Sequence, residues 1–156
     1  MKSYYDFAHN DYLYLKDVDT SKPTSYNSFC ALSQKTCERF LKHIVDQYVR
    51  AEDIVSAKEK EDVLKTHSLR KLYTYLKQYL PDFVIDRNVL YMADSYYFAV
   101  QYPGDNAYFA TKEDVDACDL ALTACKDAVA AYVVLQEELL QSHDTLDKGG
   151  DGKCES

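Results

Sequence analysis

The segment SFCALSQKTCERFLKHIVDQY, residues 28–48, repeats apolar side chains at the three- and four-residue spacing of one face of an α-helix. This apolar stripe consists of Phe29, Leu32, Phe40, Leu41, Ile44 and Tyr48. Residues 23–25, Pro-Thr-Ser, precede it and favour a helix start, because proline and hydroxyl side chains are preferred there. The segment therefore predicts a long helix with one buried face, which needs other helices to cover it.

A second segment with this spacing is DVDACDLALTACKDAVAAY, residues 114–132. Its apolar positions are Val115, Cys118, Leu122, Cys125, Val129 and Tyr132, alternately three and four apart. Thr111 and Asp114 before this stripe resemble a capping box, in which two side chains satisfy free backbone N–H groups at a helix start. The pattern predicts a packed helix over residues 111–139.

Further patterns of the same kind predict helices over residues 5–15, 69–80 and 89–100. Pro81 ends the second of these, and Pro103-Gly104 ends the third. Residues 51–65 are rich in charge and poorly amphipathic, so we expect a solvated linker between two helices.

The fold class follows from these helices and from the scarcity of glycine. Only four glycines occur, and three of them lie in the last ten residues, which leaves few turns for β-hairpins. The sequence predicts an all-α protein, an up-and-down helical bundle of about five helices. We expect the bundle domain to span residues 1–142 and a flexible polar tail to span residues 143–156.

Length, apolar content and cysteine usage predict a cytoplasmic protein without cofactor or metal. The 156 residues suffice for one domain, and neither a membrane-length apolar run nor a signal-peptide pattern is visible. The five cysteines are an odd number and lack the two-residue gap of zinc sites. Cys30 and Cys37, like Cys118 and Cys125, are seven apart on one helix face, and we expect small buried apolar side chains.

The net charge of −8 is unevenly distributed along the chain. Residues 1–101 carry 14 Lys and Arg against 14 Asp and Glu, whereas residues 102–156 carry 4 against 12. Phosphate affinity comes largely from Lys and Arg, so an acidic chain is poorly suited to general nucleic-acid binding. Any anion site is expected in the neutral first two-thirds.

Gln34, Glu38 and Lys42 are spaced by four and therefore share one stripe of the predicted second helix. They are candidates for supporting a binding site. The structural alternative is that Glu38 and Lys42 form an exposed ion pair, which stabilises a helix by about 0.3–0.5 kcal/mol.

His67 and Ser68 stand at the start of the predicted helix over residues 69–80. The free N–H groups of a helix start can bind a phosphate. The alternative is that Ser68 or Thr66 only caps the helix. Further along, Gln101-Tyr102-Pro103-Gly104 forms a sharp stop that positions Tyr102 at a helix end.

Five segments, taken in order, resemble the HEPN family of small helical domains. They are Asp11-Tyr12-Leu13, SFCALSQKTCERFLKHIV (28–45), THSLRKL (66–72), QYPG (101–104) and TKEDVDACDLALTAC (111–125). The resemblance extends over roughly residues 4–138 and implies a helical bundle that commonly dimerises or pairs with a small nucleotidyltransferase in toxin–antitoxin and defence systems.

The resemblance also implies that some members cleave RNA without a metal, using an arginine and a following histidine with four to six residues between them. This chain has no such pair; in the nearest case, Arg39 and His43, only three residues intervene. Where similar members have arginine before Tyr-Pro-Gly, this chain has Gln101, which donates hydrogen bonds but cannot neutralise a phosphate.

The leading hypothesis is therefore a non-catalytic HEPN-type module that binds a nucleotide or a short RNA. Its expected ligand-binding residues are Lys42, His67, Ser68 and Tyr102, supported by Gln34, Glu38 and Gln101. One alternative is a dimeric interaction protein, paired with itself or with a nucleotidyltransferase through its acidic last helix. The other is a ribonuclease with a rearranged site, in which His67 and Arg70, three apart, reach one phosphate.

Overall fold

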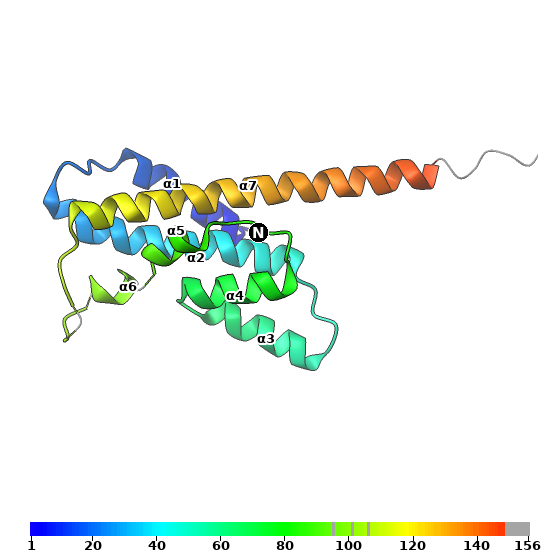
Figure 1. The fold of residues 1–156 in the computed structure, drawn as a ribbon, viewed down its shortest axis with the longest axis horizontal. Helices are drawn as coiled ribbons and strands as arrows, with labels where there is room; N and C mark the ends of the chain where they lie inside the picture. Colours follow the sequence, from blue (N-terminus) through cyan, green and yellow to red (C-terminus); the bar gives the residue numbers. More distant parts are fainter. Residues whose placement is uncertain (95, 101, 106, 149–156) are drawn as a thin grey trace, which may run out of the picture.

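The computed structural model describes residues 1–94, 96–100, 102–105 and 107–148. All regular structure in this part of the chain is helical (Figure 1). The elements in chain order are α1 (Tyr4–Asp17), the 3₁₀ turn η1 (Pro23–Ser25), α2 (Tyr26–Tyr48), α3 (Ile54–Lys65), α4 (Leu69–Tyr79), α5 (Arg87–Met92), α6 (Tyr96–Ala99) and α7 (Lys112–Lys148). The predicted all-α helical bundle is confirmed.

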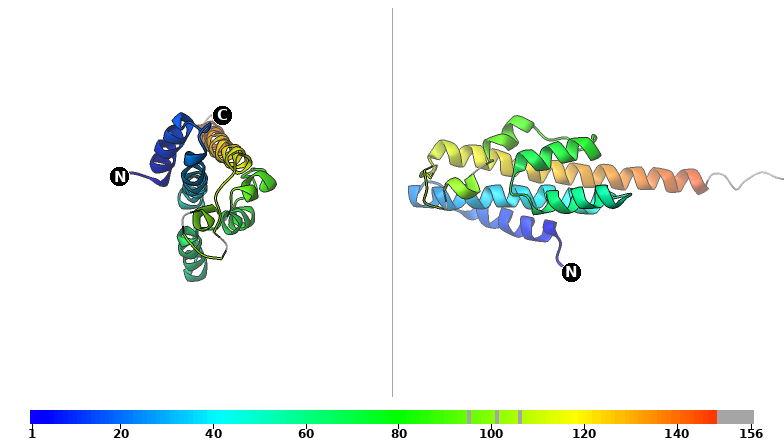
Figure 2. Two further views of the ribbon diagram at one scale, coloured as in Figure 1. Left: turned by 90° about the vertical axis from the view of Figure 1, so that its left-hand side faces the viewer. Right: turned by 90° about the horizontal axis from the view of Figure 1, so that it is seen from below.

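Helix α2 forms the centre of the bundle. Most of its predicted apolar stripe is buried, with Phe40, Leu41 and Ile44 at 0% exposure, and Leu32 and Tyr48 are partly buried. It packs against α1, α3, α4, α6 and α7, as the end-on view in Figure 2 shows. Each fully buried side chain of this size stabilises the fold by about 1.5–3 kcal/mol, so the stripe anchors the bundle.

Four cysteines join α2 to α7 in the core. Cys30, Cys37, Cys118 and Cys125 are free thiols at 0% exposure, as expected from the sequence. Cys30 contacts Cys118, and Cys37 contacts Cys125, each through a thiol–thiol hydrogen bond. That hydrogen bond and burial raise the pKa of Cys37, so the neutral thiol is the stable form.

Helix α3 corrects the expected linker over residues 51–65. Asp53 and Ser56 form a capping box at its start, and Lys58 pairs with Asp62 four residues on at 3.1 Å. Only Val63 of this helix is buried. Caps and ion pairs therefore hold α3, and the apolar spacing used to recognise helices is absent from it.

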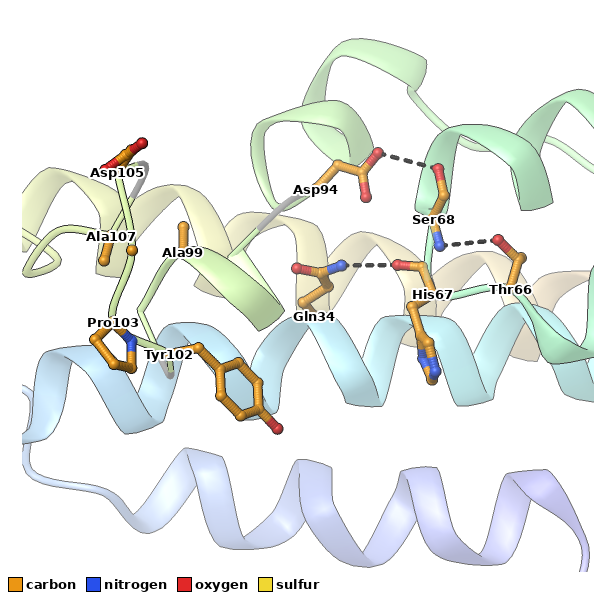
Figure 3. A pocket seen from close by; sticks show the side chains of 11 residues that line it. Gln34, Thr66, His67, Ser68, Asp94, Ala99, Tyr102, Pro103, Asp105 and Ala107 are labelled. Atoms are coloured by element: carbon orange, nitrogen blue, oxygen red, sulfur yellow. Dashed lines mark hydrogen bonds between the residues drawn. The ribbon is translucent and has the colours of Figure 1, made fainter.

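The predicted helix over residues 89–100 is divided into α5 and α6. Backbone bonds from Ala93 N to Leu90 O and from Asp94 N to Tyr91 O, both 3.2 Å, tighten the last turn of α5. The chain then leaves the helix, and the Asp94 carboxylate turns toward α4. The break is thus tied to a tertiary contact of Asp94 (Figure 3).

Helix α7 begins as predicted and ends later. Thr111 and Asp114 form the expected capping box, with Thr111 N donating to Asp114 and Asp114 N donating to Thr111 Oγ1. The helix continues through Lys148, past the predicted tail boundary at residue 142, and Figure 1 shows its C-terminal part projecting beyond the bundle. The rest of the predicted tail, residues 149–156, lies outside the described residues.

Candidate functional site

A cleft of about 910 Å³ opens beside α2 where the turn between α3 and α4 approaches the loop after α6 (Figure 3). Gln34 lines it from α2, residues 66–68 from the α3–α4 turn, and Asp94 from the end of α5. Residues 99, 102–105 and 107 complete the wall. Four separate segments thus meet at one hollow.

Ser68 caps α4, as the structural alternative proposed. Lys71 N donates to Ser68 Oγ at 3.3 Å, and Ser68 N donates to Thr66 Oγ1 at 3.2 Å. These local bonds fix the α3–α4 turn and hold its side chains at the cleft edge.

The Asp94 carboxylate lies at the start of α4, where a phosphate was expected. Leu69 N donates to Asp94 Oδ1 at 3.0 Å, and Arg70 N donates to Asp94 Oδ2 at 3.4 Å. The Asp94 side chain is only 7% exposed. An internal carboxylate therefore already satisfies the N–H groups and the positive dipole end of this helix.

Arg70 lies beside Asp94, outside the residues that line the cleft. Its Nε is 3.6 Å from Asp94 Oδ2, and its guanidinium lies 4.2 Å from the centre of the Tyr91 ring. His67, its partner in the ribonuclease hypothesis, contacts Glu38 instead. His67 and Arg70 therefore contact different partners.

Glu38 and Lys42 form a buried pair beneath the cleft. Lys42 Nζ lies 3.1 Å from Glu38 Oε1, and their side chains are 8% and 3% exposed, respectively. The expected surface pair is therefore wrong, because the α3–α4 turn covers this part of α2. A buried pair that loses one partner leaves a buried charge, so it matters far more to the fold than an exposed pair.

His67 connects this buried pair to the cleft. Its Nδ1 lies 3.2 Å from Glu38 Oε1, and Gln34 Nε2 donates to the backbone oxygen of His67 at 3.0 Å. The His67 side chain remains 53% exposed. The Gln34–Glu38–Lys42 stripe thus acts as a polar support for His67, with Lys42 itself outside the cleft lining.

Tyr102 lines the opposite part of the cleft from the loop after α6, and its side chain is 54% exposed. Two hydrogen bonds anchor this loop: Tyr108 N donates to the backbone oxygen of Ala99 at 3.0 Å, and Ala110 N donates to the side-chain Oδ1 of Asn27 at 2.7 Å. Figure 3 shows the Tyr102 and His67 rings on the same side of α2. Gln101, a predicted supporting residue, lies outside the described residues.

The hydroxyl of Tyr96 fastens α6 to α7. It donates to Asp114 Oδ1 at 2.6 Å, and burial together with this bond raises the pKa of Tyr96. Tyr96 therefore stays a neutral donor, and the short helix that carries the cleft loop has a fixed attachment.

Sequence reasoning brought Gln34, His67, Ser68 and Tyr102 to this site and missed Asp94 and Asp105. Asp94 stands in the sequence between Ala93 and Ser95, inside an apolar helical pattern. A short acidic residue next to a serine favours a helix break, because both side chains compete for backbone bonds. That signal was present and was outweighed by the apolar spacing around it.

The described residues contain neither a metal-binding cluster nor a membrane-spanning helix. There, no three or more His, Cys, Asp or Glu side chains are grouped so as to hold a metal ion. Within the same part of the chain, no helix combines the length and apolar character that crossing a membrane requires.

A model of the family described as "HEPN domain" matches residues 21–121, more than half of the chain. Every described residue that lines the cleft falls within this range. No curated protein and no solved structure shows a significant match to the chain.

Proposed function

The chain belongs to the HEPN domain family, and from this premise we propose that it is a non-catalytic module that binds a nucleotide or a short RNA, of the kind used in toxin–antitoxin or defence systems. No arginine in the sequence precedes a histidine with four to six residues between them, and this supports a binding role.

One observation carries this proposal. His67, Ser68 and Tyr102, assigned to a ligand site from sequence, line one cleft together with Gln34, although they come from separate segments. A concave site with an aromatic face and a few oriented polar groups is the usual form of a small-molecule site.

Each residue has a distinct part in the proposed site. Tyr102 offers an exposed ring on which a base stacks, a contact worth about 1–3 kcal/mol per base. His67 supplies an imidazole at the cleft wall, positioned by the contact of its Nδ1 with Glu38. Ser68 shapes the α3–α4 turn, and Lys42 acts indirectly, by neutralising Glu38.

The test is a thermal-shift panel on the full chain, with nucleosides, nucleotides and a short single-stranded RNA. A ligand at about a hundred times its Kd stabilises a protein by roughly 2.7 kcal/mol. At about 2–4 °C per kcal/mol, the shift is easily measured.

The variants Tyr102→Ala and His67→Gln should remove the shift, whereas Tyr14→Ala should preserve it. Tyr14 is a matched control because it is 62% exposed on α1 and lies outside the cleft lining. Lys42 is a poor probe because its removal leaves Glu38 buried and unpaired. A flat panel, or a shift that survives Tyr102→Ala combined with His67→Gln, contradicts the proposal.

A second candidate function is a dimeric interaction protein that pairs with a second copy or with a nucleotidyltransferase. The supporting observation is the projecting part of α7 in Figure 1. Its exposed apolar side chains include Leu135 (38%), Leu139 (45%), Leu140 (67%) and Leu146 (75%). Apolar residues at this spacing on an uncovered helix favour pairing with another helix.

Light scattering at increasing protein concentration tests this candidate. Leu139→Ser combined with Leu146→Ser should give a monomer, whereas Leu120→Ser should leave the mass unchanged, since Leu120 is equally apolar but lies on the bundle half of α7. A wild-type chain that is monomeric at high concentration contradicts the homodimer and leaves only the nucleotidyltransferase form of this candidate.

A further inference from the structure

The charges around the cleft are unfavourable for phosphate. Asp94 and Asp105 contribute two carboxylates to the lining, and the described lining residues include no Lys or Arg. The two neighbouring positions that the structure does not describe, Gln101 and Asn106, are uncharged residue types. Asp94 is compensated by Arg70 and by the start of α4, so the like charge that a phosphate would meet here is the exposed Asp105 carboxylate.

Two cations close to this region, Lys42 and Arg70, are already engaged. Lys42 is buried against Glu38 at 3.1 Å. Arg70 lies against Asp94 and the Tyr91 ring, outside the lining. Both have carboxylate partners, so neither is available to neutralise a ligand phosphate without losing a present contact.

The helix start that most resembles a phosphate site is also occupied. The N–H groups of Leu69 and Arg70 donate to the Asp94 carboxylate. A phosphate would have to displace a carboxylate that is 93% buried and that the chain itself holds next to these N–H groups. Such a tethered group competes at a high effective concentration.

We propose that the cleft takes the nucleoside part of its ligand, base and ribose, and discriminates against nucleotides in proportion to their phosphate charge. This inference rests on the proposed nucleotide- or RNA-binding function and specifies which chemical group enters. Tyr102 supplies the stacking face, and the exposed Asp105 carboxylate supplies an acceptor for ribose hydroxyls or an exocyclic amine. For an RNA, the group recognised is a terminal nucleoside without phosphate.

Coulomb's law sets the size of the expected discrimination. A pair of like unit charges about 7 Å apart in a water-like medium weakens binding roughly threefold. Salt screens such repulsion, with a Debye length of about 30 Å at 0.01 M and about 8 Å at 0.15 M. If the cleft repels phosphate, its affinity for nucleotides therefore rises as the salt concentration rises. If the cleft were lined by cations, that affinity would fall.

The experiment is calorimetric titration of the full chain with adenosine, AMP and ATP, at low and at physiological salt. We expect adenosine to bind at least about threefold more tightly than AMP at low salt, and AMP more tightly than ATP. The gap should shrink at the higher salt. ATP as the tightest ligand, with an affinity that falls as salt rises, overturns the inference while leaving the proposed binding function intact.

Variants that change the charge test the named carboxylate. Asp105→Asn should reduce the adenosine-to-AMP affinity ratio about threefold. Asp144→Asn, which removes the same charge from the projecting part of α7, should leave the ratio unchanged. An equal ratio in all three proteins overturns the assignment to Asp105. If none of the four common nucleosides and their phosphates binds, the proposed function fails, and this inference fails with it.

Discussion

Lys42 and Glu38, one turn apart on α2, form an ion pair with Nζ 3.1 Å from Oε1 and with less than a tenth of either side chain exposed. Glu38 also holds His67 Nδ1 at 3.2 Å, so one carboxylate joins a core cation to a side chain at the cleft. Glu38 Oε2 has no hydrogen-bond partner in the described structure, which makes the pair the main compensation for this buried charge.

The first prediction concerns this pair. Lys42→Ala should lower the free energy of unfolding by about 3–5 kcal/mol, because it leaves a carboxylate buried without its cation. Replacing both partners, as Glu38→Leu with Lys42→Met, should recover most of the loss, since apolar replacements of a buried pair are often neutral or stabilising. Urea denaturation measures both.

The control is Lys58→Ala, which breaks an exposed pair with Asp62 on α3. Its effect should stay within about 1 kcal/mol. If Lys42→Ala and Lys58→Ala destabilise the protein equally, the buried Lys42–Glu38 pair contributes no more to stability than an exposed pair.

The second prediction concerns the carboxylate at the start of α4. Asp94→Ala should destabilise the protein by about 1–2 kcal/mol, the usual effect of removing a helix cap. Amide hydrogen exchange should accelerate at Leu69 and Arg70, because their N–H groups donate hydrogen bonds to Asp94. Asp94→Asn should do less damage, because an amide oxygen still accepts a hydrogen bond.

Asp86→Ala is the matched comparison. Asp86 caps α5 by accepting from Asn88 N at 2.8 Å and Val89 N at 3.2 Å. Its removal should loosen α5 and leave the Leu69 amide protected. Unchanged exchange at Leu69 in Asp94→Ala would show that the α4 start does not depend on Asp94.

The helices that could be predicted from sequence are those held by burial. In α2 and α7 the apolar spacing and the buried side chains coincide, because one face of each helix is covered by the other. Helix α3 was missed for the opposite reason. It has a single buried residue and is held by a cap and by ion pairs, which apolar spacing does not reveal.

The sequence could predict which residues share a helix face or a helix start at the site. It could not predict which charged groups are buried or paired there. Spacing placed Gln34, Glu38 and Lys42 on one stripe, and Ser68 at a helix start. Whether that stripe faces solvent depends on where the α3–α4 turn lies, which is a long-range contact. The arrival of Asp94 at α4 likewise depends on how α5 packs, so the occupied helix start could be seen only in the structure.

The third prediction concerns the thiols between α2 and α7. Cys30, Cys37, Cys118 and Cys125 are at 0% exposure, and hydrogen bonding and burial raise the pKa of Cys37 and Cys118. A thiol reagent attacks the thiolate, so these thiols should react only as fast as the bundle opens. The measurement is labelling with a chromogenic disulfide reagent, using Cys154→Ser to remove the remaining cysteine.

Reaction should become complete within mixing time in denaturant. In native conditions the rate of thiol labelling should fall when the bundle is stabilised. It should rise in Lys42→Ala, because this substitution destabilises the bundle. Fast native labelling of two thiols, with the rest protected, would contradict the closed α2–α7 interface.

The last prediction concerns pH and His43 on α2. Burial lowers the pKa of His43 below its ordinary value of 6.5, against the weaker opposing effects of Asp46 and Asp6. Its ring lies 5.4 Å from that of Tyr5 on α1, and Nδ1 is buried without a hydrogen-bond partner in the described structure. A charged imidazole is therefore disfavoured in the folded state.

The sign follows from linkage. Above pH 6.5 His43 is neutral in both states, and its contribution to stability is fully present. As the pH falls below 6.5, the unfolded chain takes up this proton more readily than the folded one, so stability decreases until the folded pKa is reached. Carboxyls with lowered pKa, such as Asp6 and Asp114, act in the same direction only near and below their ordinary value of 3.8.

The urea midpoint should therefore fall between about pH 7 and pH 5, and His43→Gln should flatten that fall by removing the titrating group. His143→Gln, which removes an exposed histidine from the projecting part of α7, should leave the fall unchanged. A slope that is the same in the wild type and His43→Gln would mean that other groups, and not the packing of His43 against α1, control the acid sensitivity of this bundle.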